Sequence, residues 1–113
     1  MEIKQDGYEV QFDSESHTVT CSGSFRLTGN EYASIMELLN VAADAKTNSL
    51  NIDLTGLKFL NSSGINTLCK FIMRLRKNNV TQVEVTGNNE YAWQKKSLAN
   101  LEKLLPSLEL GFK

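Results

Sequence analysis

Two adjacent hydroxyl side chains, Ser62 and Ser63, are the residues of this sequence best placed to do chemistry. They follow Asn61 and precede Gly64, where an apolar strand pattern gives way to helical spacing. The first turn of a helix carries unpaired N–H groups and a partial positive charge, so a phosphate attached or bound there is stabilised. The segment is therefore a candidate site for phosphorylation or anion binding. A structural role is the alternative, because serine is a common N-cap.

The other residue types that carry catalysis are sparse and scattered. His17 is the single histidine, and the two cysteines, Cys21 and Cys69, are far apart, each within an apolar pattern. The sequence contains no GxxxxGK[ST], GxGxxG, HExxH or GxSxG motif. The usual templates for phosphate cradling, dinucleotide binding, zinc proteolysis and ester hydrolysis are thus missing. We therefore predict a protein that is not an enzyme, with no catalytic residue, no metal site and no cofactor.

The periodicity of the apolar residues predicts the elements that position the serine pair. Alternation of apolar and polar residues indicates strands, and apolar residues at three- and four-residue spacing indicate helices. The strands are expected at residues 8–12, 19–25, 49–54, 81–85 and 108–112, and the helices at about 30–45, 63–78 and 90–104. Residues 55–60, which contain Gly56, are expected to form a loop.

This order of elements predicts an α/β fold, in which an N-terminal β-hairpin and repeated βα units build one mixed sheet. Parallel strands covered by helices on both faces read as nearly continuous apolar runs, whereas the predicted strands alternate. We therefore expect the helices mainly on one face, with the other face polar and available. No linker divides the chain, so residues 1–113 are expected to form a single domain.

Composition and charge narrow the class of protein. The chain has 113 residues, of which 41% are hydrophobic and 22% charged, as is usual for one globular domain. Its net charge of −1 gives no field that would draw it to nucleic acid. No apolar run approaches the ~20 residues of a membrane span, and the N-terminus lacks the apolar segment of a signal peptide. We expect a cytoplasmic protein with neither nucleic acid nor membrane as partner.

The segment around the serine pair resembles the STAS domain, in particular the stand-alone bacterial anti-sigma factor antagonists. The resemblance rests on Ile52-Asp53-Leu54, Phe59-Leu60 and Asn61-Ser62-Ser63-Gly64-Ile65, and the predicted element order matches over nearly the whole chain. It implies a regulatory phosphoprotein in a bacterial signalling cascade that controls transcription. By this resemblance the phosphorylated residue is Ser62 rather than Ser63, which we expect to be the N-cap. The implied partners are a serine kinase that doubles as an anti-sigma factor and a metal-dependent serine phosphatase.

Two positions depart from the family pattern. Asn61 stands where the family usually has aspartate, and Arg26 where it often has an acidic residue. Two negative charges near the acceptor hydroxyl are thus missing or reversed, and an arginine there could instead pair with a phosphoserine. These departures slightly favour an alternative function, an unswitched STAS scaffold or a module that binds a nucleotide or phosphate at the helix N-terminus.

The surface expected to contact a partner continues along the helix that follows the serine pair. Asn66, Lys70, Arg74 and Lys77 recur at three- and four-residue spacing. Such a stripe is either a solvated helix face or a docking surface for an acidic patch. The predicted partner-binding residues are Asn61, Ser62, Ser63, Gly64, Arg26, Asn66, Lys70 and Arg74.

Overall fold

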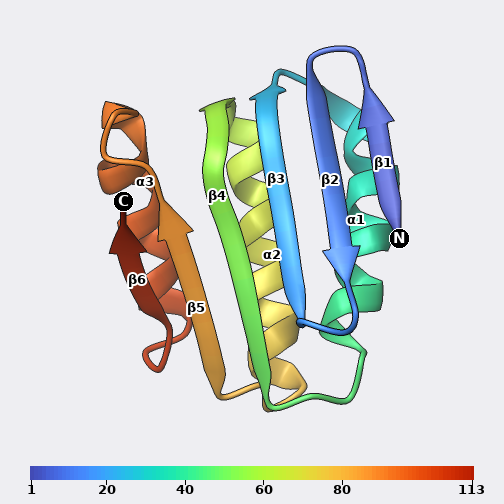
Figure 1. The fold of residues 1–113 in the computed structure, drawn as a ribbon, viewed down its shortest axis with the longest axis vertical. Coiled ribbons are helices and arrows are strands. Elements are labelled where there is room, and N and C mark those ends of the chain that lie inside the picture. The colour runs from blue at the N-terminus through green and yellow to red at the C-terminus, as the bar shows by residue number, and fades with distance from the viewer.

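Six strands form one mixed sheet, in which each strand lies beside its neighbours in the sequence (Figure 1). The computed structural model describes residues 1–113. The strands are β1 (Glu2–Gln5), β2 (Tyr8–Asp13), β3 (Thr18–Phe25), β4 (Ser49–Leu60), β5 (Gln82–Gly87) and β6 (Glu109–Phe112). β1, β2 and β3 pair antiparallel, and β3, β4, β5 and β6 pair parallel. The predicted hairpin and the mixed sheet are therefore confirmed.

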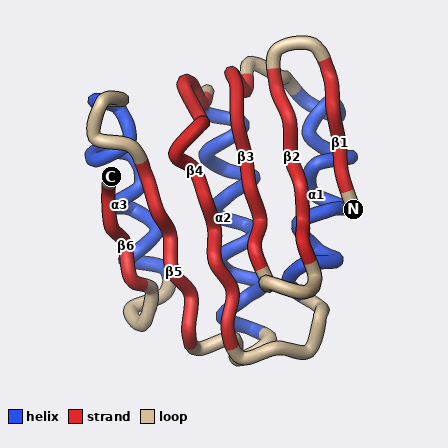
Figure 2. Tube along the Cα trace, viewed as in Figure 1, coloured by secondary structure: helices blue, strands red, loops and turns tan.

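The helices cover one face of the sheet and leave the other bare (Figures 1 and 2). They are the 3₁₀ turn η1 (Gly29–Tyr32) and the α-helices α1 (Ala33–Ala43), α2 (Ser62–Lys77) and α3 (Ala92–Leu104). These bounds agree closely with the predicted ranges. The expectation that the helices share one face is confirmed, and it explains why the strands alternate instead of being apolar throughout.

The core lies between the sheet and the helix layer and consists of one cluster of 27 buried hydrophobic residues. Inward strand positions such as Val10, Val19 and Val83 are at most 1% exposed. Cys21, which lies within the apolar pattern of the predicted strand at 19–25, is fully buried. Because a one-residue slip would turn every inward side chain to solvent, this burial fixes the register of the sheet.

β1 is a strand that the sequence pattern did not predict. It contains one apolar residue, Ile3, and so shows too little alternation to indicate a strand. A two-residue turn, Asp6-Gly7, joins it to β2, and Gly7 adopts a φ of +88° that favours glycine. Gly23 of β3 also has a φ of +88°, and a Cβ there would collide with the carbonyl oxygen of Gly7. Two glycines thus allow β1 to fold back along the sheet.

The prediction of a loop at residues 55–60 is wrong, because β4 continues through them to Leu60. The pairing of β4 with β3 shifts register between Thr20 and Ser22 and again between Gly23 and Ser24. Each irregularity changes which residue points inward. The buried residues of this half of the strand are therefore Leu54, Leu57 and Leu60, at three-residue spacing. Because apolar residues at three-residue spacing do not alternate with polar ones, the sequence pattern did not indicate a strand here.

The second half of β4 leaves β5, with which its pairing ends at Asp53 and Thr86 (Figures 1 and 2). Side chains from α3 and the turn before it satisfy the β4 carbonyl groups on that side. Gln94 donates to Leu54 and Leu57, both at 2.9 Å, Asn88 donates to Thr55 at 3.0 Å, and Trp93 donates to Lys58 at 2.7 Å. We call Asn88, Trp93 and Gln94 the α3 clamp. It holds the strand that leads to the serine pair against α3.

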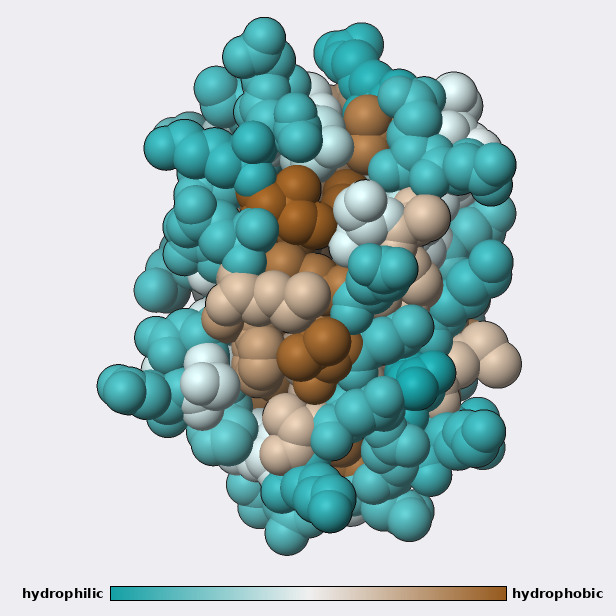
Figure 3. All heavy atoms as spheres, turned by 90° about the vertical axis from the view of Figure 1, so that its right-hand side faces the viewer, coloured by the Kyte–Doolittle hydropathy of each residue, from teal (hydrophilic) through white to brown (hydrophobic).

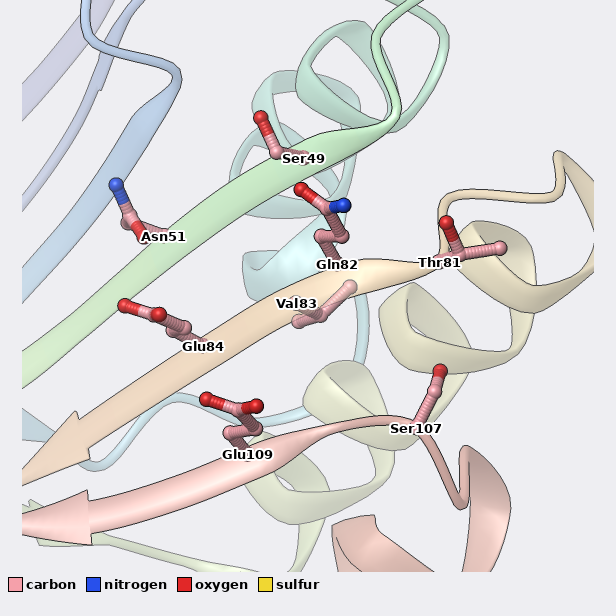
Figure 4. A pocket seen from close by; sticks show the side chains of 8 residues that line it. All are labelled: Ser49, Asn51, Thr81, Gln82, Val83, Glu84, Ser107 and Glu109. Atoms are coloured by element: carbon pink, nitrogen blue, oxygen red, sulfur yellow. The ribbon is translucent and has the colours of Figure 1, made fainter.

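The bare face of the sheet is polar, as predicted. A shallow hollow crosses β4, β5 and β6, lined by Ser49, Asn51, Thr81, Gln82, Val83, Glu84, Ser107 and Glu109 (Figure 4). Glu84 and Glu109 lie directly opposite each other on β5 and β6. The hollow lies around Ser49, where β4 begins, whereas the serine pair follows the end of β4. The two regions are therefore separate.

Candidate functional site

Asn61 is the N-cap of α2. Its backbone is extended, with φ −82° and ψ 176°, and its side-chain oxygen accepts a 2.9 Å hydrogen bond from the N–H of Gly64. The prediction that Ser63 is the N-cap is therefore wrong. Asparagine caps as well as serine does, and here it is the residue at which the strand ends and the helix begins.

Three further contacts fix Asn61 in place. The Tyr32 hydroxyl donates a 2.6 Å hydrogen bond to the Asn61 side-chain oxygen, and the Asn61 amide donates 2.7 Å to the carbonyl of Leu27. The backbone N–H of Asn61 donates to the carbonyl of Phe25 at 3.1 Å. The start of α2 is thus tied to the end of β3 and to η1. The sequence predicted none of these bonds, since Tyr32 fits a helical apolar pattern that says nothing of its hydroxyl.

The hydroxyls of Ser62 and Ser63 are both exposed and make no hydrogen bond within the chain. Their backbone N–H groups lie in the first turn of α2 and have no acceptor in the chain. Because Asn61 supplies the cap, neither hydroxyl is needed to begin the helix. The structure therefore leaves two free hydroxyls and two free N–H groups at the positive end of α2.

Gly64 is buried directly below this turn. A Cβ at Gly64 would lie 2.7 Å from the Tyr32 hydroxyl and would collide with the side chain of Leu60. Glycine is therefore required for α2 to approach η1 and the end of β4. Gly64 shapes the predicted site from beneath and presents no side chain to a partner.

Arg26 lies beside the serine pair and stacks on Phe59. Phe25 pairs with Leu60 across β3 and β4, so the residues that follow them, Arg26 and Asn61, leave the sheet side by side. The guanidinium carbon of Arg26 is 4.4 Å from the centroid of the Phe59 ring, which is 37% exposed. A cation over an aromatic face is favourable by about 0.5–1 kcal/mol at an exposed site. The pair presents a charged and an apolar group next to the serines.

A groove of about 320 Å³ runs between η1, the start of α1 and the first half of α2. Its α2 wall carries Ser63, Asn66, Thr67 and Lys70, and its other wall carries Gly29, Asn30, Tyr32, Ala33 and Met36. The predicted residues Asn66 and Lys70 are therefore brought together with Ser63. The contribution of η1 was not predicted, because the sequence gives no signal that η1 approaches α2.

Arg74 is separated from this group by its ion pair with Asp44. Its guanidinium donates to the Asp44 carboxylate at 2.7 and 2.9 Å, in the one ion pair of the chain. The Asn78 amide also donates to Asp44, at 2.8 Å. These hydrogen bonds, first that from Arg74, lower the pKa of Asp44 below its usual value. Arg74 therefore links the end of α2 to the end of α1, while Lys70 remains unpaired.

No group of three or more histidine, cysteine, aspartate or glutamate side chains lies close enough to hold a metal ion. None of the helices combines the length and the apolar character that a membrane crossing requires.

The fold is similar to solved structures of bacterial regulators. A chain in the crystal structure of the diguanylate cyclase SiaD in complex with its activator SiaC, from Pseudomonas aeruginosa, has a TM-score of 0.76 at 12% identity, covering 100% of this chain and 99% of that chain. Apo-SiaC from the same organism has a TM-score of 0.74 at 15% identity, covering 100% and 97%. An anti-sigma factor antagonist from Mycobacterium paratuberculosis has a TM-score of 0.60 at 20% identity, covering 96% and 82%.

Sequence comparison identifies the family. A search of curated proteins found no match to this chain. The STAS domain model, in contrast, matches residues 13–108, a span that contains the serine pair, Asn61 and all of α2. The capped helix start, the free serines after it, the three α-helices and the strands β3, β4 and β5 all lie within that match. The chain therefore belongs to the STAS domain family.

Proposed function

We propose that this STAS protein is a non-enzymatic switch that binds a partner protein around the start of α2 and releases it when Ser62 is phosphorylated. The observation that carries the proposal is the exposed Ser62 hydroxyl in the first turn of α2, which has no partner because Asn61 caps the helix. A kinase can therefore modify Ser62 without breaking a structural hydrogen bond. The docking surface is formed by the serine pair, the groove beside α2, and the Arg26 and Phe59 pair.

The physics of phosphorylation supports a switch at this position. A phosphate adds about 1.5 to 2 negative charges to a surface that otherwise presents neutral hydroxyls. Within the chain, those charges meet the positive end of α2 and the nearby Arg26, so the modified form remains stable. A partner shaped for the neutral surface instead loses contact with Ser62 and meets a new charge. The modification therefore weakens binding more than it perturbs the fold.

The partner class follows from the family and its structural relatives. By family resemblance the partner is a serine kinase that doubles as an anti-sigma factor, with a metal-dependent phosphatase that reverses the modification. SiaC, which shares the fold, is an activator that forms a complex with a diguanylate cyclase. An unpaired Lys70 beside the groove favours an acidic patch on the partner. We propose that the partner is a signalling enzyme of one of these kinds.

Affinity capture from the native host with a Ser62→Glu bait tests the proposal. The wild-type bait should retain a partner that Ser62→Glu loses, and intact mass of the native protein should show one phosphate at Ser62. Ser14→Glu is the matched control, because Ser14 is exposed in the turn between β2 and β3, at the opposite end of the sheet (Figure 1). Equal retention of the partner by both variants, with no phosphate on Ser62, contradicts the switch. Tight binding of a nucleotide without modification would instead support the small-ligand alternative.

A further inference from the structure

We propose that two copies of this chain associate through β1, forming an antiparallel, in-register pair centred on Ile3. β1 is an edge strand that hydrogen-bonds only to β2, so one side of its backbone is free (Figure 1). The proposal is independent of the partner-binding function, because β1 lies at the edge of the sheet and the serine pair lies at the start of α2.

In an antiparallel pair, alternate residues of each strand hydrogen-bond to the partner strand. Which residues of β1 bond to β2 therefore decides which backbone N–H and C=O groups of β1 are free. Met1 and Phe12 exchange two backbone hydrogen bonds, of 2.9 and 3.2 Å. In an antiparallel pair such residues alternate with pairs that exchange none, so Ile3 bonds to β2 while Glu2 and Lys4 do not. The N–H and C=O groups of Glu2 and Lys4 therefore point to the free edge, where a second strand could meet all four.

The side chains of β1 are complementary to a second copy of the same strand. When Ile3 lies opposite Ile3 of the second copy, Glu2 lies opposite Lys4 on either side of the two-fold axis. Glu2 and Lys4 are both exposed and belong to no ion pair within the chain. Opposite charges placed directly across a sheet stabilise the pairing of its strands. The sequence Glu-Ile-Lys is thus self-complementary when antiparallel, in charge and in apolar contact.

The helix layer beside β1 presents an apolar flank that this arrangement would cover. Met36 of α1 lines the groove shared with α2. Because a helix turns about 100° per residue, Val41 lies about 140° around α1 from Met36, on the flank away from α2. Val41 is 48% exposed and Met1 61% exposed. The side of the molecule that carries β1 and α1 shows hydrophobic side chains gathered along its middle (Figure 3).

The opposite edge of the sheet does not offer the same complementarity. Within β6 the single charge is Glu109, and an antiparallel pair that matched it with Lys113, just beyond the strand, would be centred on Gly111, which brings no apolar side chain to the contact. The Lys95 amine lies 5.9 Å from the centroid of the Phe112 ring, so a positive charge stands beside the apolar side chain at that edge of the sheet. Lysine and a short strand are devices that blunt an edge against foreign strands. At β1, Lys4 lies opposite Glu9 of β2 within the chain, and a second copy would place Glu2 on its other side.

The proposed dimer is weak, because a four-residue strand provides few contacts. We expect a dissociation constant on the order of 100 µM, typical of a small interface. Sedimentation equilibrium from about 10 µM to about 1 mM should show a reversible dimer of the wild-type chain. Glu2→Lys and Lys4→Glu should each be monomeric, since each places like charges opposite one another. An equimolar mixture of the two variants should dimerise again, because the two lysines of one strand then face the two glutamates of the other.

Two controls keep the test specific. Glu109→Lys changes the same kind of charge on the other edge strand and should leave the dimer intact. The Glu2 and Lys4 amides should become protected from hydrogen exchange as concentration rises, whereas the Ile3 amide is protected throughout. A chain that stays monomeric at about 1 mM overturns the proposal. So does a dimer that survives Glu2→Lys or that Glu109→Lys disrupts, since its contact must lie elsewhere.

Discussion

The hydroxyl of Tyr32 in η1 donates a 2.6 Å hydrogen bond to the side-chain oxygen of Asn61, the residue that caps α2. The same oxygen accepts from the N–H of Gly64, and the Asn61 amide donates to Leu27. The Asn61 side chain thus connects Tyr32 in the wall of the groove, the segment after β3, and the helix that carries the serine pair. Changes at Asn61 should therefore affect stability and function in ways that changes at the serines do not.

Replacement of Asn61 by alanine should destabilise the protein by about 2–3 kcal/mol. It removes the N-cap, leaves the Leu27 carbonyl without its partner, and leaves the Tyr32 hydroxyl only its longer contact with the Phe25 carbonyl, at 3.2 Å. Ser62→Ala and Ser63→Ala should each change the free energy of unfolding by less than about 0.5 kcal/mol, because neither hydroxyl is bonded. Urea denaturation of the three variants measures this. A larger loss for Ser63→Ala than for Asn61→Ala would mean that Ser63 caps the helix in solution.

Tyr32 should make the stability of the protein fall at alkaline pH. Burial raises the pKa of Tyr32 above its ordinary value of 10.0. Above about pH 10 the unfolded chain therefore loses the Tyr32 proton while the folded chain keeps it, which favours unfolding. Stability supplied by this group is complete below about pH 10 and declines as the pH rises toward the folded pKa. The difference in unfolding free energy between wild type and Tyr32→Phe should shrink between about pH 8 and pH 11.

Asn61→Asp should increase the rate at which a family kinase phosphorylates the chain and shorten the life of the phosphoserine. The carboxylate restores the charge that the family usually has, and at ~4 Å it repels a phosphate by about 1–4 kcal/mol per charge pair. The amide donor to Leu27 is lost, so a modest loss of stability is also expected. Timed intact-mass measurements check both rates. Asn100→Asp, which adds the same charge at an exposed position of α3, is the control, and equal rates for all three proteins would show that Asn61 is neutral.

Gln94 should be among the least replaceable residues of the chain. It is fully buried, donates to the carbonyls of Leu54 and Leu57, and accepts a 2.6 Å hydrogen bond from the N–H of Asn88. Gln94→Ala leaves three buried backbone groups unpaired, and a loss of about 3–5 kcal/mol is expected.

Gln94→Glu provides the sharper variant of this test. A protonated carboxyl can still donate to one carbonyl, whereas a carboxylate donates to none and is buried. The folded-state pKa of the introduced acid is therefore raised, so this variant loses stability as the pH rises above about 4.3, the unfolded value. Thermal melts at about pH 4 and pH 7 should differ more for Gln94→Glu than for Gln94→Ala. If the change in melting temperature between the two pH values is the same for both variants, the side chain at position 94 is in contact with water and not buried.

Cys21 should react with thiol reagents only when the protein unfolds. Burial, assisted by the charge of Asp53, raises the pKa of Cys21 to about 12, so almost no thiolate forms at neutral pH. Cys69 is half-buried and its pKa is raised by partial burial alone, so it should react slowly in the folded state. A Cys69→Ser variant isolates the reaction of Cys21, whose rate should match the unfolding rate. Immediate labelling of Cys21 in folded protein would contradict its burial.

The sequence predicted the fold well where packing enforces a simple period. One face is buried in each of the strands β2 and β3 and in each of the helices α1, α2 and α3. A single buried face requires apolar residues at the period of the strand or helix, and this period is visible in the sequence. The part of β4 beyond Leu54 was not predicted, because its bulges replace alternation with three-residue spacing. β1 escaped because Ile3 alone represents its buried face. In both cases long-range pairing, and not local pattern, makes the strand.

The candidate site was predicted in position but not in its internal roles. Spacing and residue type were enough to single out Asn61, Ser62, Ser63 and Gly64. Three adjacent residues of capping type compete in this segment, and only the tertiary bonds to Tyr32 and Leu27 select Asn61. Likewise the pairing of Arg74 with Asp44 depends on the crossing of α1 and α2, which the sequence pattern of either helix alone does not encode.

The α3 clamp makes one side of the end of β4 depend on side-chain identity, while the other side keeps its main-chain pairing with β3. A strand paired along both sides is held by backbone N–H and C=O groups, which are the same at every residue. Its pairing can therefore shift register or open from one end, one hydrogen bond after another. Here four carbonyl groups are bound by three specific side chains, Trp93 and Gln94 of α3 and Asn88 of the turn before it. A displacement of α3 would therefore act on the second half of β4, the segment that leads to Ser62, through the side chains of Trp93 and Gln94.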